Sequence, residues 1–310
     1  MGPELIESTG DHRCDLITQG LIGIFDIAFP GRVLGVYLRG SHASGASIGG
    51  SDLDLYVLFR DRFADRAEFD RARALADHCA QLSPILLEII VIGEAVLQLP
   101  EAVSTALDFK LGTRLVYGTD VRPGLPDFEP DGYLRSVIHT PFNSYRFATQ
   151  RSDDGVLSYP FEHLDPDGPF FGFDQWAMPG PDGVERPSTK LLVATVGWTA
   201  TAIIALRTGR YVRDKAACAE LYRREVADEW TELVVQTHEL CRNRWAYGIP
   251  DDDHERAQLR DLCRRVPDFL NHFLLLYRDY QEAELAAGDP DRQQLAERRL
   301  AEVSWPDPVP

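Results

Sequence analysis

The chain has 310 residues, of which 44% are hydrophobic and 26% are charged, so it can bury a core and lacks the composition of a disordered protein. Its formal net charge of −17 argues against a nucleic-acid-binding protein, which presents a basic face, and favours a small or cationic substrate. No run of about 18 apolar residues predicts a membrane span, and the N-terminus lacks the basic and apolar regions of a secretory signal. The five cysteines form no C-x-x-C pair, so we expect reduced thiols in a cytoplasmic protein.

The first 121 residues alternate between helical and strand patterns. Apolar residues recur at helical spacing over residues 12–29, and Pro30-Gly31 ends that run. Short apolar runs predict strands over residues 33–38, 53–59, 84–92 and 113–118, and helical patterns occupy residues 63–82 and 100–110. The alternation predicts a domain over residues 1–121 that combines a β-sheet with helices.

A less regular region follows over residues 122–187. It consists of a Pro-rich linker over 122–131, a helix over 132–151 and a segment over 153–187 that is dense in Pro, Gly and Asp. A loop of that length is usually functional or disordered, and its aromatic residues favour an ordered flap. Acids and aromatics there would suit a cationic or sugar-like acceptor, although each one alone is more simply explained as a loop residue.

The last part of the chain, residues 188–310, has helical patterns throughout. A buried helix over 188–209 ends at Gly209. Further helices are predicted over residues 214–226, 228–245, 253–263, 267–286 and 290–303. We therefore expect an all-helical C-terminal domain, and nothing in the pattern fixes an oligomeric state.

The informative segment is LRGSHASGASIGGSDLDLYVLF, residues 38–59. After the strand that ends at Leu38, Gly40-Ser41 predicts a tight turn into a short helix that begins near His42. Backbone N–H groups at such a helix start can bind phosphate oxygens, Gly40 allows close backbone approach, and Ser41 adds a hydroxyl donor. Ser51 leads into the next strand. We expect His42 to be a surface histidine.

Three acids follow this turn. Asp52 and Asp54 are two residues apart in a strand, so both carboxylates point to one face, where they can hold a divalent metal ion against a triphosphate. Glu88 is the one charge in the apolar run PILLEIIVI, and burying a lone carboxylate there is costly. Pairing of the two strands would bring Glu88 beside the aspartates. Arg39 adjoins the turn, and we expect its side chain to be solvated.

The segment resembles the motif of the DNA polymerase β-like nucleotidyltransferase superfamily, with Gly40-Ser41 and Ser51-Asp52-x-Asp54 in matching positions. The resemblance implies an α+β fold with a nucleotidyltransferase-type mixed β-sheet and flanking helices. It also implies that Asp52 and Asp54 bind magnesium, with two ions expected, and that Glu88 completes the acidic triad. In some members the third acid is a metal ligand, and in others it is the catalytic base.

A second likeness lies in the helical half. The segment TGRYVRDKAACAE, residues 208–220, is similar to aminoglycoside adenylyltransferases of the streptomycin/spectinomycin type. This similarity implies that Lys215 contacts nucleotide phosphate and that Glu88 is the catalytic base. The match is short, and Asp214 precedes the lysine where the family has the lysine followed by an acid.

The sequence thus predicts a magnesium-dependent transfer of a nucleoside monophosphate, AMP from ATP, to a hydroxyl group of a small molecule, with an aminoglycoside-like acceptor favoured. The site residues are Gly40, Ser41, Ser51, Asp52, Asp54, Glu88 and Lys215. A toxin–antitoxin-type enzyme that modifies protein or tRNA is an alternative, although the acidity counts against tRNA. A second alternative is a non-catalytic nucleotide-binding module, and the intact acids Asp52, Asp54 and Glu88 argue against it.

Overall fold

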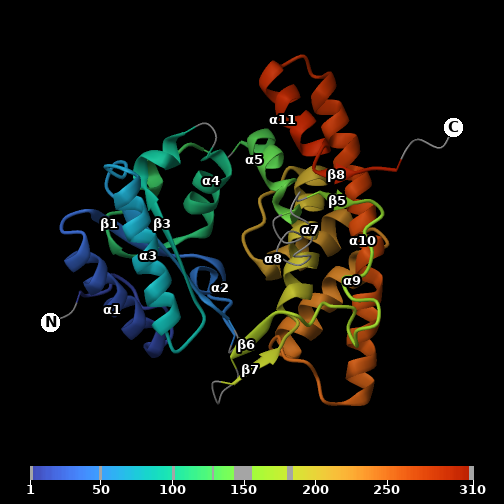
Figure 1. Cartoon of the computed structure of the whole chain (residues 1–310), viewed down its shortest axis with the longest axis horizontal. Coiled ribbons are helices and arrows are strands. Elements are labelled where there is room, and N and C mark those ends of the chain that lie inside the picture. Colours follow the sequence, from blue (N-terminus) through green and yellow to red (C-terminus); the bar gives the residue numbers. More distant parts are fainter. Residues whose placement is uncertain are drawn as a thin grey trace. The chain divides into compact units, whose positions relative to one another are not determined.

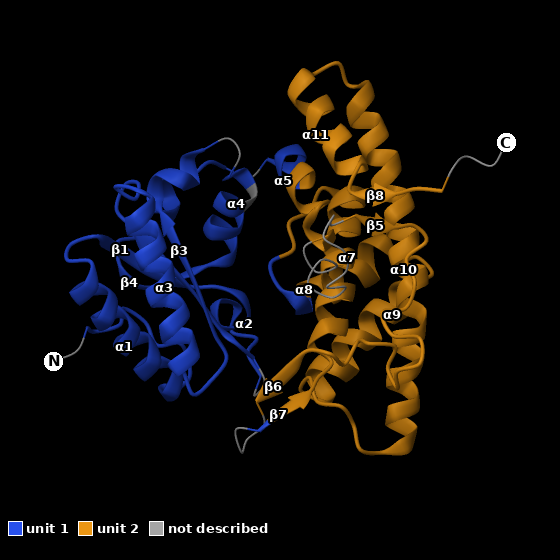
Figure 2. Cartoon of the chain, viewed as in Figure 1, with its two compact units in different colours: residues 1–133, 181–184, 213–216 blue, residues 134–180, 185–212, 217–310 orange. Residues whose placement is uncertain are grey.

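The computed structural model describes residues 3–48, 51–99, 102–127, 129–142, 156–179 and 184–306. Two compact units are distinguished by their internal contacts (Figure 2). The first consists of residues 1–133, 181–184 and 213–216, and the second of residues 134–180, 185–212 and 217–310. Each unit is described below by itself.

The first unit is built on a four-stranded mixed sheet (Figure 1). Its strands are β1 (Val33–Leu38), β2 (Leu53–Phe59), β3 (Leu87–Gly93) and β4 (Arg114–Gly118), in the spatial order β3-β2-β1-β4. β1 is antiparallel to β2 and β4, whereas β2 and β3 are parallel. The predicted strands are confirmed. β3 starts later than expected, after Pro84, which has no N–H to donate to a ladder.

Helices cover both faces of this sheet. α1 (His12–Ala28) and α3 (Arg66–Leu82) pack on one face, in a core with Leu53 and Leu55. α4 (Val103–Gly112) packs on the other face, together with a 3-10 helix, η1 (Glu94–Gln98), and a short one over 122–124. The fold class predicted for this part, a mixed sheet with flanking helices, is confirmed. The face under α4 is the one that carries the candidate site.

The second unit is mainly helical, as predicted. Its helical segments are α5 (Pro130–Val137), shared with the first unit, α7 (Lys190–Thr208), α8 (Lys215–Leu221), η4 (Tyr222–Val226), α9 (Thr231–Gln236), η5 (Thr237–Arg244), α10 (Asp253–Ala286) and α11 (Pro290–Leu300). Gly209 ends α7 with a left-handed conformation, as expected. The segments η4 and η5 are π-helical, so the predicted helices 214–226 and 228–245 each change hydrogen-bond register part of the way along.

The predicted break between 263 and 267 is wrong. α10 continues through Pro267, which is buried inside it. A proline removes one main-chain hydrogen bond from a helix and normally interrupts it. Here Val266, Phe269 and Leu270 are fully buried around it, and their packing offsets that loss.

The predicted flap over 153–187 belongs mainly to the second unit and contributes a few buried residues to its core where the structure describes it. Two strands, β6 (Ala177–Pro179) and β7 (Glu185–Pro187), form a hairpin, and β5 (Leu157–Ser158) pairs with β8 (Val303–Ser304). Four aromatic residues are buried: Phe161, Phe170, Phe171 and Phe173. Their burial explains these four aromatic residues, and a role of the segment in acceptor binding stays a prediction. Residues 143–155, which include Tyr145 and Arg146 and the end of the predicted helix 132–151, lie outside the described residues.

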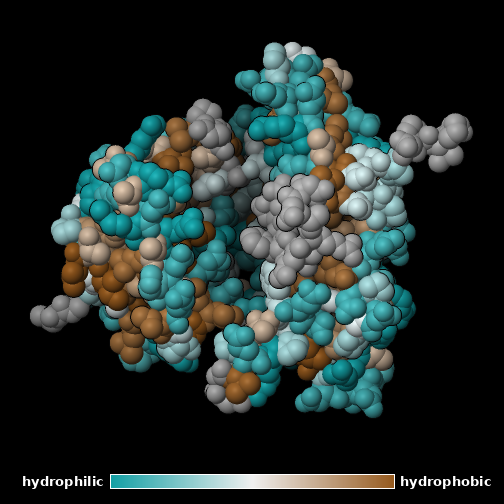
Figure 3. All heavy atoms as spheres, in the orientation of Figure 1, coloured by the Kyte–Doolittle hydropathy of each residue, from teal (hydrophilic) through white to brown (hydrophobic). Residues whose placement is uncertain are grey.

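Two apolar helices of the chain differ in how far they are exposed to solvent. Within the described residues, α7 is the one helix long and apolar enough to cross a membrane, with a mean hydropathy of 1.5, and 67% of that stretch is buried in the protein. This is the placement of a core helix. On α1, by contrast, Leu16, Ile24 and Ile27 are exposed, and Figure 3 shows hydrophobic residues gathered there.

Candidate active site

The strand register brings the predicted acids together. In the parallel pair of β2 and β3, Asp54 lies opposite Glu88. Leu53 and Leu55 point into the core and are fully buried, so Asp52 and Asp54 point to the other face. The pairing expected from the sequence is therefore present, and one end of the sheet carries all three carboxylates. The expectation of a buried Glu88 is wrong, because β3 is an edge strand and the Glu88 side chain is 57% exposed.

Asp54 has an unusual electrostatic environment. Its pKa is raised from 3.8 to about 8, mainly by desolvation and also by the charges of Asp52 and Glu88, whereas Arg39 and Lys215 act in the opposite direction. A carboxylate that is desolvated beside other carboxylates is unstable as an anion unless a cation offsets its charge. The arrangement is therefore one that a bound cation would stabilise.

Gly40 packs directly against this carboxylate. The turn after β1 forms α2 (Gly40–Ser44), a five-residue helix that begins two residues before the predicted start. Gly40 has φ of +61°, and a Cβ at this position would lie 2.5 Å from Asp54 Oδ2. Only glycine fits both the backbone angle and the contact. The glycine of the predicted turn is thus explained by the position of the acid.

Ser51 closes the loop between α2 and β2. Its hydroxyl oxygen accepts a hydrogen bond from the Ile48 N–H at 2.9 Å, and its own N–H donates to the Ile48 carbonyl at 2.8 Å. This reciprocal pair fixes the chain just before Asp52. Gly49 and Gly50 lie outside the described residues.

Arg39 lies at the candidate site, although the sequence predicted a solvated side chain for it. Its side chain is only 23% exposed, its Nη1 lies 3.5 Å from Glu88 Oε1, and its guanidinium lies 5.3 Å from the centre of the Tyr56 ring. Burial lowers its pKa, but Tyr56, Asp108, Asp54 and Glu88 together raise it above the ordinary value. The expectation of a solvated arginine is wrong, because the ring and the acids hold the cation in place.

Replacing Arg39 is expected to destabilise the first unit. Arg39→Gln should lower the free energy of unfolding by about 2 kcal/mol, since it leaves the acids without their nearest cation and removes the contact with Tyr56. The measurement is urea unfolding.

Arg66 provides a matched control for this substitution. It also pairs with an acid, Asp70, at 3.0 Å and lies 5.4 Å from the Phe69 ring, but its side chain is 77% exposed. Arg66→Gln should change the free energy of unfolding by less than about 0.5 kcal/mol. Equal losses for Arg39→Gln and Arg66→Gln would contradict the role assigned to burial.

His42 is not a surface residue, contrary to expectation. Its side chain is 7% exposed, its Nδ1 has no hydrogen-bond partner within the described part of the chain, and burial lowers its pKa. The sequence predicted a helix that begins near His42, whereas α2 begins at Gly40 and His42 is its third residue. The difference in helix start explains why this burial was not predicted.

Lys215 is the first residue of α8, as the sequence predicted. Residues 213–216 group with the first unit, and the charge of Lys215 lowers the pKa of Asp54. Just before it, Asp214 is paired with Arg213 at 3.0 Å. The lysine therefore adds positive charge to the environment of the acids.

The donor set suits magnesium bound together with phosphate. Among the described residues, no group of three or more His, Cys, Asp or Glu side chains is arranged to hold a metal ion. Asp52 and Asp54 supply carboxylate oxygens on one face, while Glu88 lies beside Arg39. Magnesium is commonly bound by one or two carboxylates, with substrate phosphates completing its shell, so the two aspartates fit such an ion.

Comparison with known proteins gives distant likenesses among solved structures. No family model and no curated protein matches the sequence. Among solved structures, a spectinomycin adenyltransferase from Enterococcus faecialis, crystallised with ATP and spectinomycin, is similar. The similarity spans 82% of this chain and 98% of that one, with a TM-score of 0.43 and 13% sequence identity.

Proposed function

We propose that the chain is a magnesium-dependent nucleotidyltransferase that moves AMP from ATP to a hydroxyl group of a small molecule. The observation that carries the proposal is the partly buried, desolvated Asp54 carboxylate, which lies beside Asp52, against the backbone of Gly40 and opposite Glu88. The motif resemblance assigns the same residues to metal and nucleotide binding. A metal ion bound together with phosphate would offset the free-energy cost of burying this acid. The close approach of the chain to the acid requires glycine at position 40.

The reaction needs positioning and charge neutralisation more than covalent catalysis. The acceptor oxygen forms a bond to the α-phosphorus, the bond from that phosphorus to the bridging oxygen of the β-phosphate breaks, and pyrophosphate leaves. Glu88 takes the proton of the attacking hydroxyl. A magnesium ion bound through Asp52 and Asp54 would neutralise phosphate charge.

The remaining residues bind the phosphates that leave. Gly40 lets the chain approach the triphosphate closely, and the Ser41 hydroxyl and backbone can donate hydrogen bonds to it. Ser51 holds the loop that connects this turn to Asp52. Lys215 offsets the negative charge of the β- and γ-phosphates, as the resemblance to the adenylyltransferase family implies.

The acceptor is proposed to be small and cationic, with an aminoglycoside-like molecule favoured. The net charge of −17 attracts cations and repels a nucleic-acid backbone. This protein is expected to act in the cytoplasm, because its five cysteines, all free, would remain reduced there.

The test combines an acceptor panel with two variants. Purified protein is incubated with each NTP, magnesium and a set of aminoglycosides, and pyrophosphate release and product mass are followed. Glu88→Gln should lower kcat by about 100-fold, because the base is lost while the nucleotide contacts remain. Lys215→Ala should mainly raise the KM for ATP, by about tenfold.

The same assay separates the other functions. A product heavier than the acceptor by one nucleoside monophosphate supports the proposal. Labelling of macromolecules in a lysate, without small-molecule products, would favour a toxin-type enzyme. Stabilisation by ATP without turnover of any acceptor, in wild-type and Glu88→Gln protein alike, would favour a non-catalytic binding module.

A further inference from the structure

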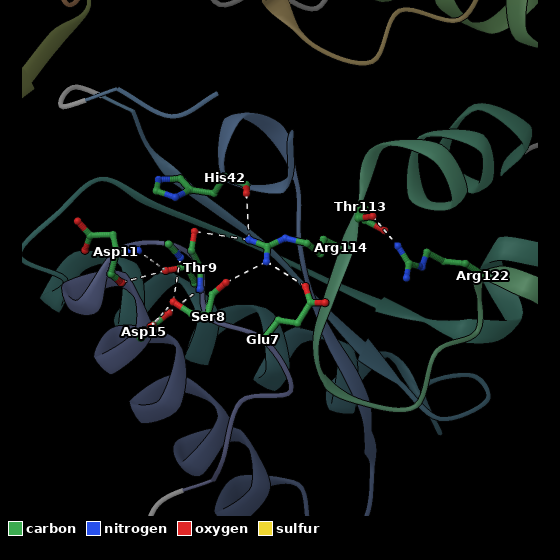
Figure 4. Close-up of polar contacts among 10 residues, drawn as sticks. Glu7, Ser8, Thr9, Asp11, Asp15, His42, Thr113, Arg114 and Arg122 are labelled. Atoms are coloured by element: carbon green, nitrogen blue, oxygen red, sulfur yellow. Dashed lines mark hydrogen bonds and ion pairs between the residues drawn. The ribbon is translucent and has the colours of Figure 1, made fainter. Parts of the chain in front are cut away.

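Arg114 connects β4 to two other segments of the first unit (Figure 4). Its guanidinium Nη1 lies 3.1 Å from Glu7 Oε2 and donates to the Ser8 carbonyl at 2.9 Å. Its Nη2 donates to the Thr9 carbonyl at 3.5 Å and to the His42 carbonyl at 3.3 Å. One side chain therefore ties the segment before α1 to the short helix α2.

The segment before α1 is itself firmly held. Ser8 Oγ donates to Asp15 Oδ2 at 2.7 Å, and the Thr9 N–H donates to Asp15 Oδ1 at 2.6 Å. The Ile6 N–H donates to the Val116 carbonyl of β4 at 2.8 Å. Because both its ends are fixed, to β4 and to α1, the segment offers Arg114 a rigid set of acceptors.

The position of Arg114 suits a restraint on α2. It pairs with Leu38 in the ladder of β1 and β4, at the end of β1 from which the Gly40 turn departs. The last carbonyls of a helix lack intrahelical donors, and arginine is a favourable partner for them. α2 has only five residues, so the His42 carbonyl is one of these groups.

We propose that Arg114 is a positioning residue for nucleotide binding, which acts by fixing α2 and, through it, Gly40 and Ser41 against Asp54; the inference rests on the proposed function. A Cβ on Gly40 would approach Asp54 Oδ2 to 2.5 Å, so the Gly40 turn is in close van der Waals contact with the Asp54 carboxylate. A small displacement of α2 would separate the phosphate contacts from the metal ligands and weaken ATP binding, and a loss of about 1.4 kcal/mol corresponds to about tenfold in affinity.

The test compares Arg114→Gln with a matched control, Arg122→Gln. Arg122 also bonds a main-chain carbonyl, that of Thr113, at 2.6 Å and pairs with Asp120 at 2.8 Å, but no bond joins it to α2 within the described residues. Arg114→Gln should raise the KM for ATP about tenfold and leave kcat within about threefold. Hydrogen exchange in the ligand-free protein should speed up over residues 40–46. Arg122→Gln should change neither.

A third variant, Arg114→Lys, completes the comparison, and hydrogen exchange over residues 40–46 is a readout that does not depend on activity. Arg114→Lys retains one donor and should give an intermediate KM, which separates positioning from misfolding. If Arg114→Gln matches Arg122→Gln in both KM and exchange, the inference is wrong. If the wild-type protein transfers no nucleotide, the proposed function fails, and unchanged exchange over residues 40–46 in Arg114→Gln would then overturn the restraint as well.

Discussion

Asp54→Asn is expected to abolish nucleotidyl transfer and, at pH 8, to raise the melting temperature of the ligand-free protein. Activity should fall by about 1000-fold or more, because the variant loses a carboxylate that we propose as a ligand of the metal ion. The stability effect follows from the pKa of Asp54, which desolvation and the neighbouring carboxylates raise from 3.8 to about 8. The folded state then holds the proton more tightly than the unfolded state.

The direction in which the stability changes with pH follows from the raised pKa of Asp54. The stabilisation from a protonated Asp54 is complete below about pH 4 and is lost as the pH rises through about 8. Asparagine is uncharged at every pH, so the variant should gain roughly 4–8 °C over the wild type at pH 8 and almost nothing at pH 4. Thermal unfolding at both pH values checks this.

Asp70→Asn is the matched control for Asp54→Asn. Asp70 is exposed and pairs with Arg66 on the surface of α3. Its substitution should leave activity unchanged and shift the melting temperature little at either pH. An Asp54→Asn protein that is less stable than the wild type at pH 8, or that keeps its activity, would contradict the account of this acid.

Gly40→Ala is expected to reduce activity by about 100-fold or more and to destabilise the protein by about 2–3 kcal/mol. Part of the loss in stability is backbone strain, about 1–2 kcal/mol for a residue with a Cβ at φ of +61°. The remainder arises because the new methyl group would lie 2.5 Å from Asp54 Oδ2 and must displace either the turn or the carboxylate. Activity assays and urea unfolding give the two quantities.

Gly45 separates these two contributions. It ends α2 with φ of +73°, and a Cβ there would meet nothing within 4 Å. Gly45→Ala should therefore show the strain alone, about 1 kcal/mol, with activity reduced much less. If both alanine variants lose equal activity, then the contact between Gly40 and Asp54 does not matter for the reaction.

The local part of the site could be predicted from the sequence. Alternating apolar residues identify β2 and place Asp52 and Asp54 on one face, and the apolar run around Glu88 identifies β3. The pairing of Asp54 with Glu88 follows once the two strands are adjacent. The roles of Asp52, Asp54, Glu88, Ser51 and Lys215, and the number of magnesium ions, stay predictions.

Residues whose role depends on distant parts of the chain could not be predicted in this way. The environment of Arg39 comes from Tyr56 on β2 and Asp108 on α4 as well as from Glu88. Asp108 was missed, although one signal marks it: it is an acid between the buried residues Leu107 and Phe109. Such contacts arise only from the tertiary fold.

The most direct test of the central claim follows the phosphorus atoms of ATP. The protein is incubated with magnesium, the best acceptor and ATP labelled either at the α-phosphate or at the γ-phosphate, with Asp54→Asn as the control. A nucleotidyltransferase transfers the α-label to the acceptor and releases the γ-label as pyrophosphate, and the variant does neither. Transfer of the γ-label to the acceptor, or α-label transfer that survives in Asp54→Asn, would contradict the proposed reaction.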